Sequence, residues 1–188
     1  MRTDDLYSLP PDLPVPIEDG ACAHLVGMRI PPIPLSATTG EAIRLDQSLT
    51  RWTVVYAYPR TGVPDQDSPP GWDAIPGARG CTPQSCNYRD HQAELKALGA
   101  SVYGLSTQPT DYQREMVTRL HLPFPVLSDA DLELTRSLRL PTFRYGEWTL
   151  LKRFTLIIAA GVIELVIYPV FPSTADVPQV LAWLEARK

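Results

Sequence analysis

The sequence predicts an α/β fold in which a central mixed β-sheet is flanked by helices. Short apolar runs rich in β-branched and aromatic residues, such as WTVVYAY at residues 52–58, are typical of strands buried on both faces of a sheet. These runs alternate with segments of helical periodicity, such as TDYQREMVTRLHL at residues 110–122, where Met116 and Leu120 fall on one face. With 188 residues, the chain is long enough for one domain with a sizeable core.

The N-terminal part of the chain predicts an arm followed by a hairpin. Prolines recur through residues 1–32, and proline interrupts regular strand pairing because it has no backbone N–H. We therefore expect residues 1–32 to form a proline-rich arm and residues 33–188 to form the folded domain. The domain begins with IPLSATTGEAIRL (Ile33–Leu45), in which apolar residues on both sides of a Thr-Gly-Glu turn predict a β-hairpin.

The middle of the chain predicts a strand, a long loop and a helix. Pro59 ends the strand at residues 52–58, and a loop of about 20 residues follows, which is uncommon inside a compact domain and often functional. A helix is expected from Cys81 to Leu98, with Gly99 as its C-terminal stop.

The remaining elements end in a pair of strands and a C-terminal helix. Ser128 or Asp129 is expected to cap the helix that follows a short strand. Ala160 and Gly161 predict a tight turn between the last two strands. In chain order, we expect a strand at 101–106, a helix at 110–122, a strand at 124–129 leading into a helix, strands at 150–159 and 162–170, and a helix at 174–188.

Composition and charge argue against several classes of protein. A net charge of −4, from 17 basic and 21 acidic residues, disfavours a nucleic-acid-binding surface, which needs a basic face. No apolar run approaches the ~20 residues of a membrane-spanning helix. The acidic, proline-rich N-terminus lacks the apolar core of a secretory signal. We therefore expect a cytoplasmic protein without membrane or nucleic-acid partners, in a compartment where thiols stay reduced.

The chain has three cysteines. An odd number of cysteines favours catalytic or metal-binding thiols over a disulfide scaffold. Cys81 and Cys86 lie in GCTPQSCNYRD at the expected helix start, where unpaired N–H groups and the helix dipole favour a thiolate at the first position. Cys22 lies apart in the arm. We interpret it as a spectator thiol, with a role as a distant resolving partner as the alternative.

The spacing of Cys81 and Cys86 raises a geometric question. In an ideal helix, Cα atoms five residues apart are separated by roughly 8.6 Å, whereas a disulfide requires less than about 7 Å. The two thiols can therefore bond only if the first helical turns unwind. On spacing alone, the alternative that both are buried apolar side chains stays open. A metal site that adds His91 is disfavoured, because the three side chains diverge around the helix.

The segment GCTPQSCNYRD closely resembles the active-site segment of the peroxiredoxins, in the PrxQ or bacterioferritin-comigratory-protein group. Three further segments are similar to those of the family in the same order, namely VVYAYP at 54–59, LPFPVLSD at 122–129 and KRFTLII at 152–158. The resemblance covers residues 33–188. It implies a thioredoxin-like fold and a cysteine-dependent peroxidase activity that needs no metal or organic cofactor.

The resemblance also implies roles for three residues. Cys81 matches the peroxidatic cysteine, whose thiolate attacks the O–O bond of hydrogen peroxide or an organic hydroperoxide and becomes a sulfenic acid. Cys86 matches the resolving cysteine, which condenses with that sulfenic acid to an intrachain disulfide that a thioredoxin-like reductant restores. Arg153 matches the arginine that holds the thiolate and the peroxide oxygens, a task suited to a charged group with several donors. A surface ion pair is the alternative for Arg153.

The chain departs from the family in the loop before Cys81. The family pattern P-x-x-x-T-x-x-C would place its proline and threonine where this chain has Ala74 and Ala78. We therefore expect an insertion of about a dozen residues that forms a lid or an oligomer contact. Pro59 is expected to match the family proline, and Thr61 is the nearest hydroxyl that could replace the threonine.

Two functions from different classes stay open. The first is a peroxidase that reduces peroxides and is recycled by thioredoxin or a similar thiol reductant. The second is a thiol redox sensor or disulfide-exchange protein with little peroxidase turnover, which the displaced threonine and the long loop favour. A monomer is expected, with a dimer through the insertion as the alternative.

Overall fold

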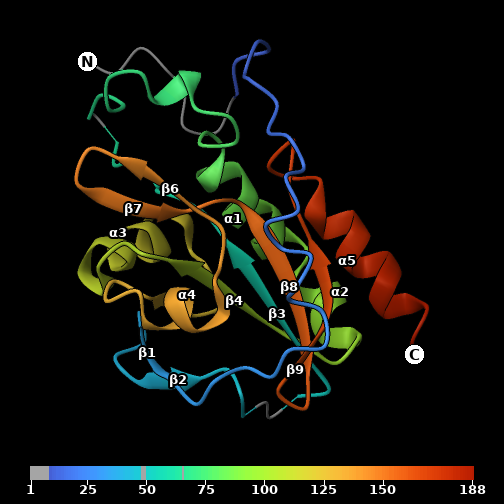
Figure 1. The fold of residues 1–188 in the computed structure, drawn as a ribbon. Coiled ribbons are helices and arrows are strands. Elements are labelled where there is room, and N and C mark those ends of the chain that lie inside the picture. Colours follow the sequence, from blue (N-terminus) through green and yellow to red (C-terminus); the bar gives the residue numbers. More distant parts are fainter. Residues whose placement is uncertain (1–8, 48–49, 65) are drawn as a thin grey trace.

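The computed structural model describes residues 9–47, 50–64 and 66–188. Within these residues, a seven-stranded mixed sheet has the strand order β2-β1-β5-β4-β3-β8-β9, and β6 and β7 form a separate two-stranded sheet (Figure 1). The strands are β1 (Pro34–Ala37), β2 (Ala42–Arg44), β3 (Trp52–Ala57), β4 (Ala100–Ser106), β5 (Val126–Ser128), β6 (Thr142–Tyr145), β7 (Trp148–Leu151), β8 (Phe154–Ala159) and β9 (Val162–Ile167). The helices are α1 (Cys81–Asp90), α2 (Gln92–Ala97), α3 (Thr110–Leu120), α4 (Glu133–Leu138) and α5 (Asp176–Glu185), with a 3₁₀ turn at Trp72–Ala74. The expected α/β class with a central mixed sheet is confirmed.

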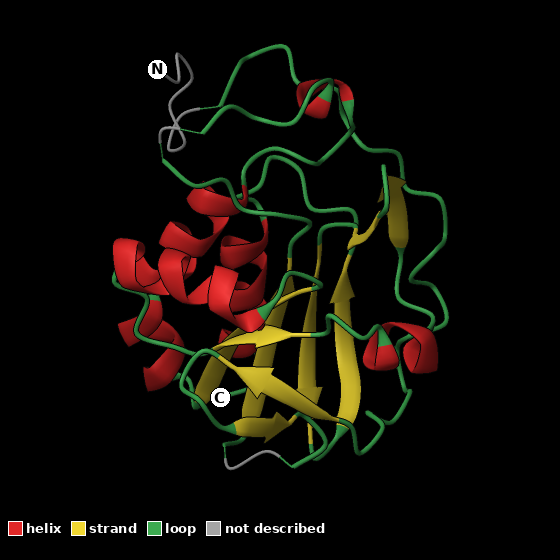
Figure 2. Ribbon diagram, turned by 90° about the vertical axis from the view of Figure 1, so that its left-hand side faces the viewer, coloured by secondary structure: helices red, strands yellow, loops and turns green. Residues whose placement is uncertain are grey.

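Helices cover both faces of the large sheet. Side chains alternate along β3, so Val54 and Tyr56 pack with α1, α2, α3 and α5, whereas Val55 and Ala57 pack with α4 and the N-terminal segment. Figure 2 shows the larger group of helices on one side of the strands and the short α4 on the other. The run WTVVYAY is therefore buried on both faces, as its composition predicted.

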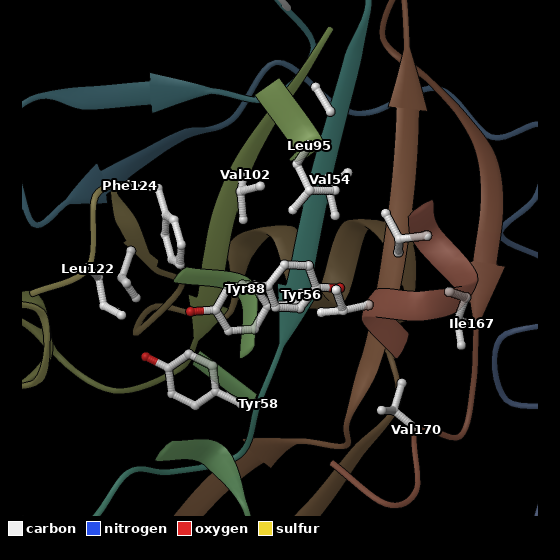
Figure 3. Packing of buried hydrophobic residues seen from close by; sticks show 14 of the residues in the cluster. Val54, Tyr56, Tyr58, Tyr88, Leu95, Val102, Leu122, Phe124, Ile167 and Val170 are labelled. Carbon is white, nitrogen blue, oxygen red and sulfur yellow. The ribbon is translucent and has the colours of Figure 1, made fainter. Parts of the chain in front are cut away.

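A stack of aromatic rings joins α1 to the sheet. The rings of Tyr56 and Tyr88 lie parallel with their centroids 4.4 Å apart, and the Tyr58 ring lies 6.0 Å from that of Tyr56 (Figure 3). All three side chains are fully buried. This packing fixes the helix that begins at Cys81 against the centre of the sheet, since aromatic pairs contribute beyond their buried area.

The strand directions determine which ends meet at the site. β3 pairs in parallel with β4 and antiparallel with β8, with Ala57 opposite Phe154. The end of β3 and the start of β8 therefore lie at one edge of the sheet. The loop that leads to α1 and the residue before β8, Arg153, leave from that same edge.

Both expected tight connections in the sheet are present. β1 and β2 form the hairpin, with Pro34 opposite Arg44. Ala160 and Gly161 join β8 to β9, and both have positive φ angles of 48° and 74°, as a two-residue hairpin turn requires.

The N-terminal segment is partly integrated into the core. Residues 1–8 of the expected arm lie outside the described residues. Leu25 and Ile30 are buried in the same cluster as the sheet and α4, and Arg29 forms an isolated bridge with Val162. The division into an arm at 1–32 and a domain at 33–188 stays a prediction.

Several expected elements were longer than the observed ones. The helix expected at Cys81–Leu98 breaks at His91, where φ is −100°, and α2 follows. The Nδ1 atom of His91 lies 2.9 Å from the carbonyl oxygen of Asn87, which also accepts the His91 backbone N–H. This side chain competes for the helical acceptor, which weakens the regular ladder at that turn.

The strand expected at 150–159 is two strands, β7 and β8, separated by Lys152 and Arg153. β7 pairs with β6, an element that the sequence interpretation missed, in a hairpin around Gly146. β9 likewise ends at Ile167 rather than at residue 170, because Pro169 cannot donate to a ladder. Among the described residues, no helix is long and apolar enough to cross a membrane.

Candidate active site

Cys81 is the first residue of α1, and its side chain is only 3% exposed. The residue before it, Gly80, has a φ of 102°, which L side chains rarely adopt. A Cβ atom on Gly80 would also lie 2.4 Å from the Oγ atom of Ser173. Glycine is therefore required at this position by both the backbone and the space, and it sets the direction in which the chain enters α1.

Arg153 contacts the sulfur of Cys81 directly. Its Nη2 atom lies 3.3 Å from Cys81 Sγ. The same nitrogen donates to the backbone carbonyls of residues 77, 78 and 79, at 3.2, 3.4 and 3.0 Å. These contacts fix the guanidinium beside the start of α1, and they rule out the alternative of a surface ion pair, since Arg153 is 3% exposed.

The position of Arg153 differs from the expected one in the middle of a core strand. It lies in the two-residue break between β7 and β8. Released from strand pairing, its side chain reaches the loop before Cys81. Its Nε atom is buried and has no hydrogen-bond partner among the described residues.

A small pocket of about 40 Å³ opens beside Cys81. Its wall is formed by residues of the long loop between β3 and α1, by the first residues of α1 and by Leu9. The lining residues that bear on the site are Arg60, Thr61, Trp72, Arg79 and Cys81. The volume fits a molecule of only a few atoms, about the size of one or two waters.

Thr61 lies in this pocket wall and is 1% exposed. Its backbone N–H donates to Gln108 Oε1 at 3.0 Å, and its hydroxyl contacts the same oxygen at 3.3 Å. The structure thus brings Thr61 into the same pocket as Cys81 but directs its hydroxyl to Gln108. Pro59 is buried at the end of β3 and is not among the residues that line the pocket.

The inserted loop covers the pocket on one side. Trp72 is 5% exposed and packs with Leu150 and Tyr145 of the β6–β7 hairpin. Arg79, next to the active-site glycine, forms an ion pair with Asp73 at 3.1 Å. These contacts favour the expectation of a lid over that of an oligomer contact, because the apolar side chain of Trp72 is already buried within the chain.

The three thiols lie in different environments, and none is bonded to another. Cys86 is half-buried against the core, and burial raises the pKa of its thiol above the ordinary value. Cys22 packs on the opposite face of the sheet from α1. Burial, with the nearby carboxylates of Glu18 and Asp19, raises the pKa of Cys22 to about 12. Cys22 is therefore protonated at neutral pH, which agrees with its interpretation as a spectator.

Two residues at the site were missed by sequence reasoning. Gln84 is fully buried, and its Oε1 atom accepts from Arg153 Nη1 at 2.5 Å. Asp176 is also fully buried and accepts from Gln84 Nε2 at 2.8 Å. Nothing in the spacing of Gln84 and Asp176, 92 positions apart, predicts this contact. The only signal was a polar residue between two cysteines on the buried side of a helix.

No group of three or more histidine, cysteine, aspartate or glutamate residues within the described ranges could hold a metal ion. Arg153 contacts the Cys81 sulfur, and Arg60 and Arg79 line the pocket together with one carboxylate, that of Asp67. The arginines suit the site to an anionic sulfur and a small polar substrate.

Comparisons with known proteins place the chain in a family. The family model described as Redoxin matches residues 25–184. Chloroplastic peroxiredoxin Q of Sedum lineare is 28% identical over 163 residues, which span 86% of this chain and 78% of that protein. Peroxiredoxin Bcp of Bacillus subtilis is 24% identical over 129 residues, 69% of this chain and 68% of that protein. This chain belongs to the Redoxin family, in its peroxiredoxin Q/Bcp group.

Solved structures agree with this assignment. The crystal structure of peroxidoxin BcpB from Mycobacterium tuberculosis matches with a TM-score of 0.72 and 25% identity, and the match covers 88% of this chain and 99% of that chain. The expected thioredoxin-like fold is confirmed. As a peroxiredoxin, the protein is a thiol-dependent peroxidase. The residues that perform this activity and their order of reaction are proposed below.

Proposed function

We propose that this peroxiredoxin reduces hydrogen peroxide and organic hydroperoxides through Cys81. The observation that supports the proposal most directly is the 3.3 Å contact between Arg153 Nη2 and Cys81 Sγ at the N-terminus of α1. A guanidinium and a helix N-terminus both stabilise negative charge on the sulfur. The adjacent pocket is large enough for a peroxide group.

The first step oxidises the sulfur by two electrons. The Cys81 thiolate attacks one peroxide oxygen, an S–O bond forms, and the O–O bond breaks. The departing oxygen leaves as water or an alcohol after it takes up a proton, and Cys81 becomes a sulfenic acid. We assign Arg153 to the developing charge on the departing oxygen, because its guanidinium already contacts Cys81 Sγ through Nη2.

Cys86 is proposed as the resolving thiol. Its sulfur attacks the sulfenic sulfur of Cys81, a disulfide forms, and one water leaves. Both cysteines lie on α1, where their Cα atoms would be roughly 8.6 Å apart in an ideal helix, beyond the reach of a disulfide. The step therefore requires the start of α1 to unwind. An exposed dithiol reductant such as thioredoxin then returns both thiols and is itself oxidised to a disulfide.

Neither Thr61 nor Pro59 is proposed to contact the sulfur: Thr61 forms part of the pocket wall, and Pro59, which does not line the pocket, ends β3 before the loop. The hydroxyl of Thr61 is engaged by Gln108, so its part is to hold the pocket wall in place. We propose that the protein is located in a reducing compartment such as the cytoplasm. A monomer stays our expectation for the assembly.

The proposal is tested by peroxide consumption. Purified protein with thioredoxin, thioredoxin reductase and NADPH should consume hydrogen peroxide over many turnovers, and Cys81→Ser should abolish this. Cys22→Ser serves as the matched control and should retain the activity. If the wild-type protein is oxidised once per chain without turnover, the sensor interpretation is correct and the proposed cycle is wrong.

A further inference from the structure

A buried chain of hydrogen bonds leads from Cys81 to the start of α5. Arg153 contacts Cys81 Sγ through Nη2 and donates to Gln84 Oε1 through Nη1. Gln84 in turn donates through Nε2 to one carboxylate oxygen of Asp176, at 2.8 Å. The four residues are at most 3% exposed, so water does not compete for these bonds.

Asp176 is held by more than Gln84. The same carboxylate oxygen accepts from Tyr88 Oη at 3.0 Å and from Thr155 Oγ1 at 2.7 Å. The other oxygen accepts the backbone N–H of Val177. These partners come from α1, β8 and α5, so the carboxylate is fixed relative to three elements at once.

The carboxylate determines which way the Gln84 amide faces. An amide has a donor end and an acceptor end, whereas a carboxylate only accepts and a guanidinium only donates. With Asp176 on one side and Arg153 on the other, only one orientation satisfies both, with the Gln84 oxygen toward Arg153. Without the carboxylate, the amide could turn its NH₂ group toward the guanidinium, and two donors would then face each other.

We propose that Asp176 is a positioning residue for the peroxidase reaction, which acts on Arg153 through Gln84. The inference rests on the proposed role of Cys81. Asp176 touches neither the Cys81 sulfur nor the pocket. It fixes the Gln84 amide, and that amide fixes the Arg153 guanidinium. Because Gln84 lies between Cys81 and Cys86, the same link also holds the start of α1 that must unwind for the disulfide to form.

This double role gives an unusual kinetic signature. Asp176→Asn replaces the carboxylate by a group that also has a donor end, so Gln84 loses its fixed orientation. We expect the rate constant for oxidation of Cys81 by hydrogen peroxide to fall roughly tenfold or more, as for other misplaced catalytic groups. We expect the later formation of the Cys81–Cys86 disulfide to be faster than in the wild type. A purely structural defect would not slow one step and accelerate the other.

A double variant tests whether Asp176 acts on Arg153 by fixing the donor and acceptor ends of residue 84. When Asp176→Asn is combined with Gln84→Glu, the amide introduced at position 176 donates to the new carboxylate at position 84, and that carboxylate accepts from Arg153. The pair of changes moves the negative charge one step toward Arg153 and restores the donor–acceptor pattern. We expect the double variant to regain most of the first oxidation rate, measured by stopped-flow fluorescence. Asp129→Asn removes another buried carboxylate, which caps α4 in the opposite layer, and serves as the control.

The outcomes separate this inference from the proposed function. If Cys81→Ser retains peroxide turnover, the proposed function itself is wrong. If the wild type works through Cys81 and Asp176→Asn is oxidised at the wild-type rate, only the positioning role is wrong. It is also wrong if the defect of Asp176→Asn persists unchanged in a Gln84→Met background, where the link no longer exists. Should Asp176→Asn fail to fold, Gln84→Met alone decides, since a wild-type rate in that variant would overturn the inference.

Discussion

At the scale of single residues, the contacts of Arg153 explain why a charged side chain can be buried beside the Cys81 thiol. One of its nitrogens is shared among three backbone carbonyls and the sulfur, and another donates to Gln84. The planar guanidinium satisfies these acceptors simultaneously, which a lysine ammonium on a flexible stem does not. The loop before Cys81 and the arginine therefore hold each other in place.

We expect Arg153→Lys to lower the rate constant for oxidation of Cys81 by roughly 100-fold. A lysine keeps the positive charge but lacks the several N–H donors that the planar guanidinium holds in fixed directions. The rate is measured by stopped-flow mixing with hydrogen peroxide. Arg44→Lys, on a half-buried ion pair with Asp46, is the matched control and should leave the rate unchanged. Equal rates in Arg153→Lys and wild type would contradict the role of the guanidinium.

A second expectation concerns Gly80. Gly80→Ala places a side chain at a φ of 102° and within 2.4 Å of Ser173 Oγ. The backbone conformation alone costs about 1–2 kcal/mol for an L residue, and the contact requires Ser173 or α1 to move. We expect a lower urea midpoint and slower oxidation of Cys81. Gly40→Ala has a similar φ of 93° with nothing within 4 Å, so it should lower stability without affecting oxidation.

At the scale of elements, the proposed cycle requires α1 both to hold Cys81 in place and to unwind at its start. Its first two turns are tied to the core by Gln84 and by Ser85, which accepts from Tyr56 Oη at 3.1 Å. The stacked rings of Tyr56 and Tyr88 hold the following turn. Cys81 is thus placed by a folded helix, whereas the proposed disulfide requires the same turns to unfold.

Cys86→Ser should separate these two requirements. We expect the first oxidation of Cys81 to keep its wild-type rate, since Cys86 does not contact the sulfur in the folded helix, while thioredoxin-driven turnover slows strongly. Single-turnover oxidation and steady-state NADPH consumption, measured on the same preparation, provide the comparison. Unchanged turnover in Cys86→Ser would remove the resolving role.

Much of the fold could be predicted from local pattern, and the exceptions have physical causes. The β-branched run of β3 and the turn at Ala160 and Gly161 depend on neighbouring residues only. The break before β8 could not be predicted, because Lys152 and Arg153 leave the strand to contact the N-terminal segment and the loop before Cys81. The hairpin of β6 and β7 had a local signal in Tyr-Gly-Glu-Trp that was missed.

The candidate site could be predicted where its residues lie in segments that resemble those of the family. Cys81, Cys86 and Arg153 follow from segments that resemble those of the family. The partners of Arg153 do not, since Gln84 and Asp176 meet only after α5 folds back against α1. The position of Thr61 near the pocket depends on how the inserted loop folds, which no spacing rule determines.

At the scale of the whole molecule, the N-terminal segment is tied to the strand break that carries Arg153. Asp19 accepts from Lys152 at 2.6 Å and from Tyr168 at 2.8 Å. These hydrogen bonds lower the pKa of Asp19 from 3.8 to about 2. The lower value in the folded state means that the tie stabilises the fold above the unfolded pKa and is lost as pH falls from about 4 toward 2.

The loss of this tie can be measured. We expect the urea midpoint of the wild type to exceed that of Asp19→Asn at pH 5, and the difference to shrink and vanish as the pH approaches 2. A difference between wild type and Asp19→Asn that stays constant from pH 5 to pH 2 would contradict the tie.

The most direct test of the whole account is to identify the sulfur that reacts first. Cys86→Ser protein is treated with one equivalent of hydrogen peroxide in the presence of dimedone, which traps sulfenic acids, and the adduct is mapped by mass spectrometry. We expect a single adduct on Cys81 and none on Cys22. An adduct on Cys22, or rapid peroxide loss without any adduct on Cys81, would contradict the account.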